Sequence, residues 1–376
     1  MPIHLNTWLF ATAPSSFVWF IRATLLFIIA SPLLAAVELP RQQVSLAYNG
    51  YSGDELSIDS QRLLLRTQIL NRYSIGANFQ HDVVNDASID FRQQEVYKEE
   101  RDTATIHSAY LYENSLFEAS FSNHEESDYQ AKTLSMDVSQ ATLSGLGTWH
   151  MGYSRGWDKL GKRDSNLDEN INRHRLRLGL TQVLSRQWQG QFNYELVSDS
   201  GRLDNPYIEA IVSNVNVTAN YPSTRLGHAF SASLLQYLRS NTVAKLHYRY
   251  FTDSWDIRAH SLSMNYVAPL RNPFWHLDYH VRAYRQSAAS FYSDNAGQLN
   301  TYVSRDKKHS SFYDIELGFN ARIDLSQWVA PYVEVLHGNF GYNAIFYTYL
   351  DYNDPATDTP FSFSAGIIQC YVTAKF

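Results

Sequence analysis

Apolar and polar residues alternate along most of the chain from about residue 44 onward. The last nine residues, 368–376, show the alternation most clearly. One face of this segment carries the apolar residues Ile368, Cys370, Val372, Ala374 and Phe376, and the other carries Gln369, Tyr371, Thr373 and Lys375. Because successive side chains of a strand point to opposite faces, the pattern predicts a β-strand that is apolar on one side and polar on the other.

The same two-residue period recurs in segments such as 62–69, 173–180, 188–196, 245–250, 275–282 and 314–323. In these segments rows of charged residues alternate with rows of Leu, Tyr, Phe and Trp. If the apolar rows face lipid, the polar rows line a lumen. The predicted lumen-lining residues are Arg62, Arg66, Asp137, Arg173, Arg175, Arg177, Glu195, Lys245, His247, Arg249, His276, Asp278, His280, Arg282, Asp314, Glu316 and Glu334.

The segments number about 16, and the connections between them alternate between short and long. Short ones include 70–72 and 184–186, and the predicted long ones are 50–57, 85–102, 123–131, 156–170, 198–224, 252–257, 292–311 and 342–360. A soluble sandwich also alternates, but it does not explain both alternations. We therefore expect an all-β, antiparallel, up-and-down transmembrane β-barrel, with short periplasmic turns, longer outer loops and both termini periplasmic.

Composition removes several other classes of protein. The 376 residues are 44% hydrophobic, 18% charged and 14% aromatic, with a mean hydropathy of -0.34. Beyond residue 40 there is no apolar run of the roughly 20 residues that a membrane-spanning helix needs. The formal charge of -6 argues against nucleic acid as a partner. The single cysteine, Cys370, excludes an internal disulfide.

Residues 17–36 carry the pattern of a secretory signal peptide. Arg22 precedes a short apolar core, and Ser31-Pro32 and Ala35-Ala36 follow it. We expect cleavage near Ala36-Val37, which divides the chain into a signal peptide (1–36) and a barrel (37–376); an uncleaved anchor helix is the alternative. Cleavage removes one Arg and no acid, leaving 30 basic and 37 acidic residues and a net charge of -7.

The terminal Phe376 resembles the C-terminal insertion signal of Gram-negative outer-membrane barrels. The resemblance implies a location in the outer membrane of a Gram-negative bacterium. It also implies two partners: outer-membrane lipid and the outer-membrane assembly machinery.

Both signs of charge on the predicted inner wall allow two interpretations. The wall could order charge across a pore and so select solutes. Alternatively, its charged residues could simply pair across neighbouring strands, as Arg177 and Glu195 would across the turn at 184–186. The two interpretations do not exclude each other.

No pattern in the sequence singles out catalytic or metal-binding residues. On a strand, His276 and His280 would lie about 13 Å apart, too far to share one ion without Asp314 or Glu316 from the next strand. We expect no cofactor, no metal and no enzymatic activity, because no local set of nucleophile, base and orienting group stands out.

Carboxylates cluster in three predicted outer loops. The clusters are Asp54, Glu55 and Asp59; Glu125, Glu126 and Asp128; and Asp351, Asp354 and Asp358. They could bind a hard cation such as calcium, or they could be solvated loop residues near the cell surface.

Four ordered segments resemble a proteobacterial exported family known as domain of unknown function 3570. They are Tyr51–Asp59, Asn123–Ala131, Gly152–Asp158 and Asp204–Tyr207, and the likeness extends over almost the whole mature chain. The resemblance implies an outer-membrane barrel, accompanied by a small lipoprotein or a periplasmic redox protein. It implies no established activity. It directs attention to the loop residues Trp157, Asn205 and Tyr207, together with the acidic residues near Asp54 and Asp128.

The sequence thus favours a barrel that forms a pore for small polar solutes. A membrane anchor or sheath for a periplasmic or surface partner is the alternative, and a barrel hydrolase is a third possibility.

Overall fold

The fold was analysed in a computed structural model of the chain. The structure describes residues 37–54, 56–86, 97–161, 169–204, 208–238, 242–270, 274–329, 333–354 and 357–376. The predicted signal peptide, residues 1–36, lies outside the described residues. Within these ranges, no helix combines the length and the hydrophobicity needed to span a membrane.

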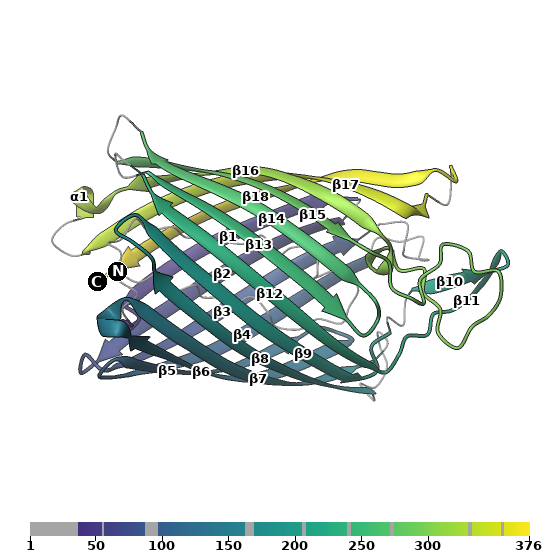
Figure 1. The fold of residues 1–376 in the computed structure, drawn as a ribbon, viewed down its shortest axis with the longest axis horizontal. Helices are drawn as coiled ribbons and strands as arrows, with labels where there is room; N and C mark the ends of the chain where they lie inside the picture. The colour runs from purple at the N-terminus through teal and green to yellow at the C-terminus, as the bar shows by residue number, and fades with distance from the viewer. Residues whose placement is uncertain are drawn as a thin grey trace.

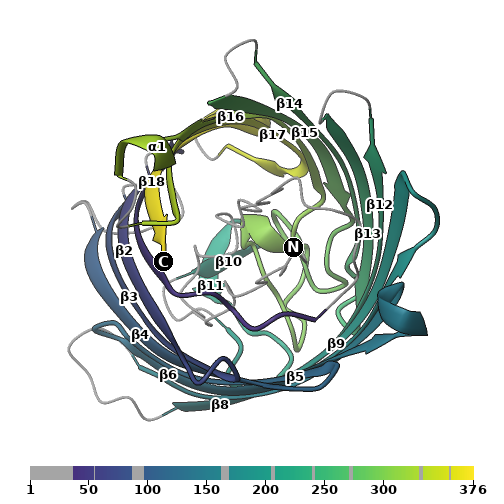
Figure 2. The ribbon, with the colours of Figure 1, turned by 90° about the vertical axis from the view of Figure 1, so that its left-hand side faces the viewer.

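Sixteen antiparallel strands close into a barrel. Figures 1 and 2 show the closed wall from the side and along its axis. Each strand pairs with its neighbours in sequence, and the first strand pairs with the last, Gln43 lying opposite Lys375. The strands are β1 (Gln43–Gly53), β2 (Leu56–Ile69), β3 (Tyr73–Asp86), β4 (Tyr97–Tyr112), β5 (Ser115–Glu125), β6 (Tyr129–Thr142), β7 (Gly147–Leu160), β8 (Glu169–Val183), β9 (Trp188–Gly201), β12 (Thr224–Tyr237), β13 (Val243–Asp253), β14 (Arg258–Pro269), β15 (Trp275–Gln286), β16 (Phe312–Asp324), β17 (Val335–Asn353) and β18 (Pro360–Lys375).

A separate hairpin, β10 (Glu209–Val212) and β11 (Val215–Thr218), is not part of the barrel sheet. Because this hairpin belongs to a connection, β9 pairs directly with β12. Three single turns complete the regular structure: η1 (Leu143–Gly145), η2 (Lys307–His309) and α1 (Ser326–Val329). The predicted closed barrel and its sixteen strands are confirmed.

The two faces of the wall differ in polarity as the alternation predicts. In β18, Ile368 and Val372 are 43% and 49% exposed on the outside, whereas Gln369 and Tyr371 point inward and are buried. Large apolar side chains cover the outer face all round the barrel. Closure pairs the backbone of every strand, which a bilayer requires, so the fold lets these side chains contact lipid.

The short turns gather at one end of the barrel, beside the first residue of β1 and the last residues of β18. Leucines in these turns are strongly exposed: Leu70 by 84%, Leu143 by 66% and Leu184 by 58%. Leu70 and Asn71 have positive φ angles of 53° and 55°, as a two-residue hairpin turn requires. The apolar outer belt therefore continues down to the turns at this end, which by turn length is the periplasmic end.

The expected lengths of several outer loops were wrong. The connection at 50–57 is short, since β1 runs to Gly53 and β2 begins at Leu56, and the one at 123–131 shrinks to residues 126–128. Strand β17 likewise runs on to Asn353. Above the bilayer both faces of a strand meet polar surroundings, so the alternation fades although the backbone pairing continues. Among the described outer connections, 202–223 and 287–311 are long.

Candidate functional site

Three arginines of β8 form an ion-paired ladder on the inner wall. Arg173 donates through Nε to Asp158 Oδ2 at 2.5 Å and contacts Asp199 at 3.2 Å. Arg175 pairs with Glu195 at 2.9 Å, and Arg177 pairs with Asp137 at 2.8 Å. The arginines project inward from every second position, and the acids come from the adjacent strands β7 and β9 and from β6, one strand further away. The ladder is therefore neutralised within the wall.

The predicted partner of Arg177 was wrong, although the register was right. Arg177 lies opposite Glu195 on one side, as expected, but its guanidinium turns the other way, toward Asp137. Gly152 of β7 lies between Arg177 and Asp137 in the register. A Cβ atom on Gly152 would lie 1.9 Å from Asp137 Oδ1, so only glycine lets the two side chains meet across the intervening strand.

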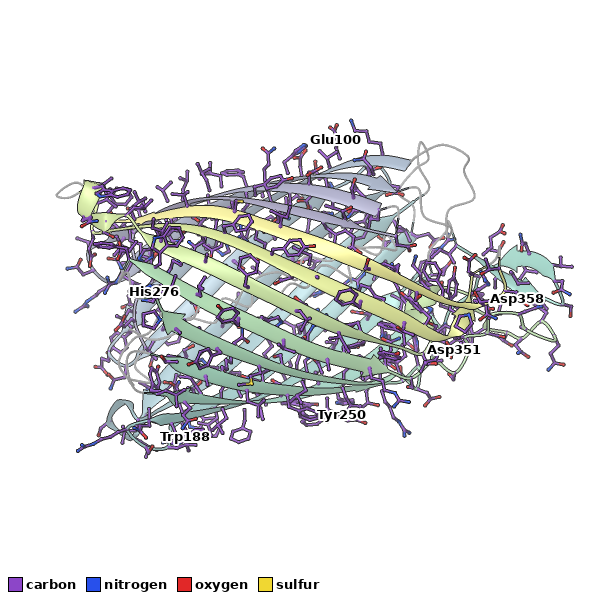
Figure 3. The ribbon with its side chains drawn as sticks, turned by 90° about the horizontal axis from the view of Figure 1, so that it is seen from above. Glu100, Trp188, Tyr250, His276, Asp351 and Asp358 are labelled. Carbon is purple, nitrogen blue, oxygen red and sulfur yellow. The ribbon has the colours of Figure 1, made fainter. Side chains whose placement is uncertain are left out.

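A second charged group lines the wall at β15 and β16. Arg282 pairs with Glu316 at 2.8 Å and with Asp314 at 2.9 Å, and His280 lies 3.8 Å from Glu316. Asp278 accepts a hydrogen bond from Asn265 at 3.4 Å. His276 is also on this inner face (Figure 3). In the described part of the chain, no group of three His, Cys, Asp or Glu side chains is arranged to hold a metal ion.

Strand β13 carries basic residues of a different kind. Lys245, His247 and Arg249 share its inner face, and His247 Nδ1 lies 2.8 Å from the Ser233 hydroxyl. The Arg249 guanidinium stacks 5.5 Å from the centre of the Phe251 ring. Among the described residues, no carboxylate makes an ion pair with Lys245 or Arg249. We call Lys245, His247 and Arg249 the basic strip.

The remaining predicted lumen residues are placed as follows. Arg62 and Arg66 lie on the inward face of β2. Glu334 precedes β17 and forms a 3.1 Å ion pair with Arg41, with 58% of its side chain exposed. It therefore belongs to the periplasmic rim, not to the lumen wall, because the strand begins only one residue later.

The outer-loop carboxylates are mostly not solvated loop residues. Glu126 is buried and contacts Arg101 at 3.1 Å, Asp128 is fully buried, and Asp54 pairs with Lys307. Asp59 and Glu125 lie on strands β2 and β5 with their side chains facing outward. In the last hairpin, Asp351 binds Ser311, Asp354 lies in the turn and Asp358 accepts from Asn353 (Figure 3).

The remaining predicted positions have different outcomes. Trp157 lies in β7, not in a loop, and its ring stacks under the Arg155 guanidinium at 5.0 Å. Glu55, Asn205 and Tyr207 fall outside the described residues. Phe376 follows β18 and is 52% exposed.

A hydroxyl, an imidazole and a carboxylate meet at the rim of β4 and β5. Thr103 Oγ1 lies 2.7 Å from His124 Nδ1, and His124 Nε2 lies 2.7 Å from Glu126. Glu126 also holds Arg101, and the side chains of His124 and Glu126 are buried. Because the carboxylate already neutralises a buried guanidinium, the arrangement is accounted for as a structural network.

Two long connections, described at residues 202–204, 208–223 and 287–311, pack together beyond the outer end of the wall, and we call them the cap. Figure 1 shows the cap projecting past the strands, and Figure 2 shows it over the barrel axis. Backbone bridges join Val212 to Ala296 and Asn220 to Val303. An apolar core that includes Ala210, Val212, Tyr221, Ala289 and Val303 holds the cap together, and Trp255 of the β13–β14 turn packs into it.

Polar contacts attach the cap to the β1–β2 turn and to strand β17. Lys307, only 1% exposed, pairs with Asp54 in the turn between β1 and β2. Arg305 donates to the Asn353 carbonyl at 2.9 Å, and the Ser311 hydroxyl donates to Asp351 at 2.6 Å. The cap is therefore held at both sides of the mouth.

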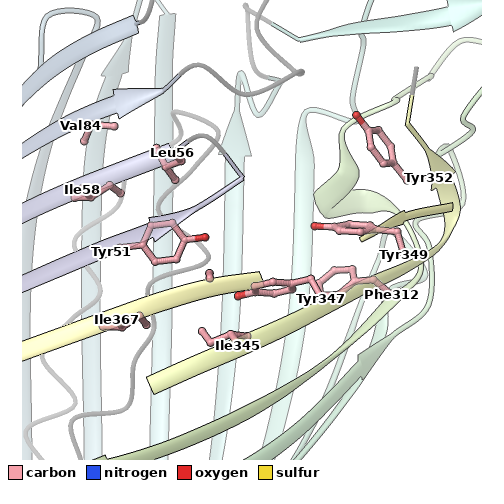
Figure 4. Packing of buried hydrophobic residues seen from close by; sticks show 11 residues of the cluster. Tyr51, Leu56, Ile58, Val84, Phe312, Ile345, Tyr347, Tyr349, Tyr352 and Ile367 are labelled. Atoms are coloured by element: carbon pink, nitrogen blue, oxygen red, sulfur yellow. The ribbon is translucent and has the colours of Figure 1, made fainter. Parts of the chain in front are cut away.

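An apolar region that the sequence reasoning missed lines the lumen below these contacts. Tyr51, Phe312, Ile345, Tyr347, Tyr349 and Ile367 pack into one buried cluster, which Figure 4 shows on the inner faces of β1 and β16–β18. We call it the aromatic wall. In the sequence, the run from Ala344 to Leu350 is apolar on both faces, and this break in the alternation was the available signal.

His309 sits at the centre of the cap. The rings of Tyr221, Trp255 and Phe291 surround its imidazole at centroid distances of 4.7, 5.3 and 5.4 Å. Its Nδ1 lies 2.9 Å from the Ser304 hydroxyl. Burial lowers the pKa of His309 well below its ordinary value, and the positive charges of Arg225 and Lys308 lower it further.

We expect the cap to loosen in acid. The closed cap excludes a proton that an opened cap would bind below an ordinary pKa of about 6.5. Closure therefore weakens by up to about 1.4 kcal/mol per pH unit as pH falls below that value. Hydrogen exchange of 287–311 measured between about pH 7.5 and about pH 5 checks this. Burial raises the pKa of Asp294, and a carboxyl group with a raised pKa opposes the effect of His309.

The matched variant is His309→Phe, which keeps an aromatic ring but cannot take up a proton. Its exchange rates, corrected for intrinsic pH effects, should not change over this range. An equally strong acid-induced rise in both proteins would contradict the role of His309.

Comparison with known proteins gives one family match and a set of similar folds. The family described as a protein of unknown function, DUF3570, matches residues 148–330. The family resemblance is confirmed. The match is narrower than the likeness drawn from the four segments, and it contains the third and fourth of them. Among curated proteins, none matches the sequence.

The similar solved structures are outer-membrane proteins. A bacterial polysaccharide outer membrane secretin has a TM-score of 0.52 at 9% identity, covering 90% of this chain and all of that one. The siderophore receptor PirA of Pseudomonas aeruginosa scores 0.47 at 9% identity over 84% of this chain, which spans 60% of the receptor's length. OpdK of Pseudomonas aeruginosa with vanillate scores 0.44 at 8% identity, covering 89% and 98%. These likenesses concern the fold, which is that of an outer-membrane β-barrel.

Proposed function

We propose that this outer-membrane barrel is a pore for small polar solutes, with its outer mouth guarded by the cap. The observation that carries the proposal is the basic strip on β13. Its cations face the lumen, whereas the arginines of β8 and β15 are neutralised by carboxylates of the wall. Charged groups that wall pairing does not use can act on a passing solute. The proposed role is non-enzymatic.

Single-channel recording tests this proposal. Folded protein in planar lipid bilayers should give discrete conductance steps. Heat-modifiable mobility on gels would establish that the sample is folded. The pore would be refuted if folded barrels inserted into the bilayer but conducted no ions, both in the wild type and in a variant whose cap is released.

The basic strip should set ion selectivity. We expect Arg249→Glu to lower the anion-to-cation permeability ratio by about two- to five-fold, because it reverses a lumen charge. The reversal potential under a salt gradient measures the ratio. Arg155→Gln is the matched control, since Arg155 is on the outer face of β7 and should leave selectivity unchanged. Equal reversal potentials for wild type and Arg249→Glu would contradict the assignment.

A second candidate is an anchor for a surface or periplasmic partner, such as a lipoprotein or a redox protein. It is favoured by the cap, which exposes Val215 by 62% and Leu299 by 68% at the outer end. Exposed apolar side chains on an ordered outer structure can serve as contacts. Stoichiometric co-purification from native membranes would support this role, and a partner-free barrel would count against it.

A further inference from the structure

Two groups of outward-facing residues on the barrel wall share one arrangement. In the first, His174 of β8 lies directly opposite Arg155 of β7. In the second, His260 of β14 lies directly opposite Arg285 of β15. All four side chains are on the outer face, in line with exposed apolar residues of the same strands, namely Tyr153, Leu178, Leu262 and Val281.

A tyrosine orients each imidazole. The Tyr153 hydroxyl lies 2.7 Å from His174 Nδ1, and the Tyr248 hydroxyl lies 2.8 Å from His260 Nδ1. Since Nδ1 is engaged, Nε2 is the ring atom that remains for a ligand. Each histidine thus leaves its Nε2 for a ligand at the register position opposite an arginine.

Both groups sit where the apolar belt ends on the outer side. Along β8 the outward residues run from Leu180 through Leu178 and Leu176 to His174. Along β15 they run from Tyr279 through Val281 and Ala283 to Arg285. This change from hydrocarbon-facing to cationic residues places the groups at the headgroup level of the outer leaflet.

In the described part of the chain, no carboxylate pairs with the residues of these two groups. Among the described residues, Arg155, Arg285 and their histidines form no ion pair, although Arg155 stacks on Trp157. The opposite part of the outer rim, on β2–β5, instead displays Asp59, Asp102 and Glu125. The outer rim is therefore basic on one side and acidic on the other.

We propose that the Arg155–His174 and His260–Arg285 groups are two binding sites for phosphate groups of outer-leaflet lipids. A guanidinium and an imidazole N–H on one surface suit a phosphate, whose several oxygens accept charge-assisted hydrogen bonds. The ligand comes from the membrane because the sites border the lipid-facing belt. The acidic side of the rim repels the same headgroups, so lipid binding is confined to one side of the barrel.

Native mass spectrometry of the folded full chain tests the proposal with bisphosphorylated lipid A as the probe. Wild type should retain up to two lipid molecules. Two double variants each disrupt one site: Arg155→Gln with His174→Gln, and His260→Gln with Arg285→Gln. Each double variant should retain one lipid molecule fewer, because the affinity of the altered site becomes about ten-fold weaker. Tyr153→Phe should weaken binding less, since it loses only the orienting hydroxyl.

Lumen-facing Arg249→Gln is the matched control and should bind lipid as wild type does. Heat-modifiable gel mobility should be unchanged in all variants, because among the described residues none of the altered side chains forms an ion pair within the wall. Three outcomes would overturn the proposal. Wild type could retain dephosphorylated lipid A as well as the bisphosphorylated form, or a variant with all four Arg and His substitutions could bind lipid A as wild type does. The third outcome is a loss of lipid binding in Arg249→Gln as large as that in the double variants.

Discussion

Replacing Arg173 with methionine is expected to lower the free energy of unfolding of the barrel by about 3–5 kcal/mol. The Arg173 guanidinium contacts both Asp158 and Asp199, and Tyr129 adds a hydroxyl donor to Asp158 at 2.7 Å. The Asp158 side chain is wholly buried. Without the shared cation, the carboxylates of Asp158 and Asp199 repel each other and keep no guanidinium partner at this position. The loss in stability is therefore larger than the loss of the attraction alone. Urea titration of the protein in lipid vesicles measures the change.

Arg41→Met is the matched control for this substitution. Its partner Glu334 is 58% exposed, and Arg41 is 37% exposed, so water replaces the lost interaction. Exposed pairs of this kind contribute at most about 1 kcal/mol. Similar losses in Arg173→Met and Arg41→Met would show that the ladder does not stabilise the wall as described.

Replacing Lys307 with methionine is expected to release the cap from the β1–β2 turn. The side chains of Lys307 and Asp54 are 1% and 7% exposed, so the variant leaves a buried carboxylate without this ammonium group. Breaking such a pair costs about 3–5 kcal/mol, which is a large part of the free energy that can keep a loop in its closed conformation. We expect much faster proteolysis within 287–311 and, if the pore proposal holds, longer open times in single-channel records.

The double variant Lys307→Met with Asp54→Leu separates the ion pair from other effects. With both charges gone, apolar side chains can fill the same volume, and protection of the cap should be largely regained. Lys98→Met, at an exposed pair with Glu100, should leave the cap as in wild type. Unaltered proteolysis in Lys307→Met would refute the proposed role of this contact.

The two-residue period of the chain was enough to predict the wall. It set the faces of β18 and β8, the approximate strand number and the antiparallel connection of neighbours. This is possible because a strand's facing is decided by residues two positions apart, and a closed membrane sheet forces all polar rows inward. The register that places Arg177 opposite Glu195 also followed from the short turn between them.

The partner of Arg177 could not be predicted, because it depends on what stands between strands. Glycine at position 152 leaves open the space through which Arg177 reaches Asp137. The absence of a side chain on a neighbouring strand affects which residues pair only after the sheet is assembled. The same holds for the two outward Arg–His groups, whose members lie on different strands.

By itself the sequence determined a sealed cylinder with an apolar exterior, a polar interior and a defined order of strands. The tertiary structure alone decided which charges are neutralised, where the aromatic wall lies, and that two connections close over the mouth. The reason is range. Alternation is local, whereas Lys307 and Asp54 are separated by 253 positions, and burial of their charges is favourable only once the finished barrel holds them together.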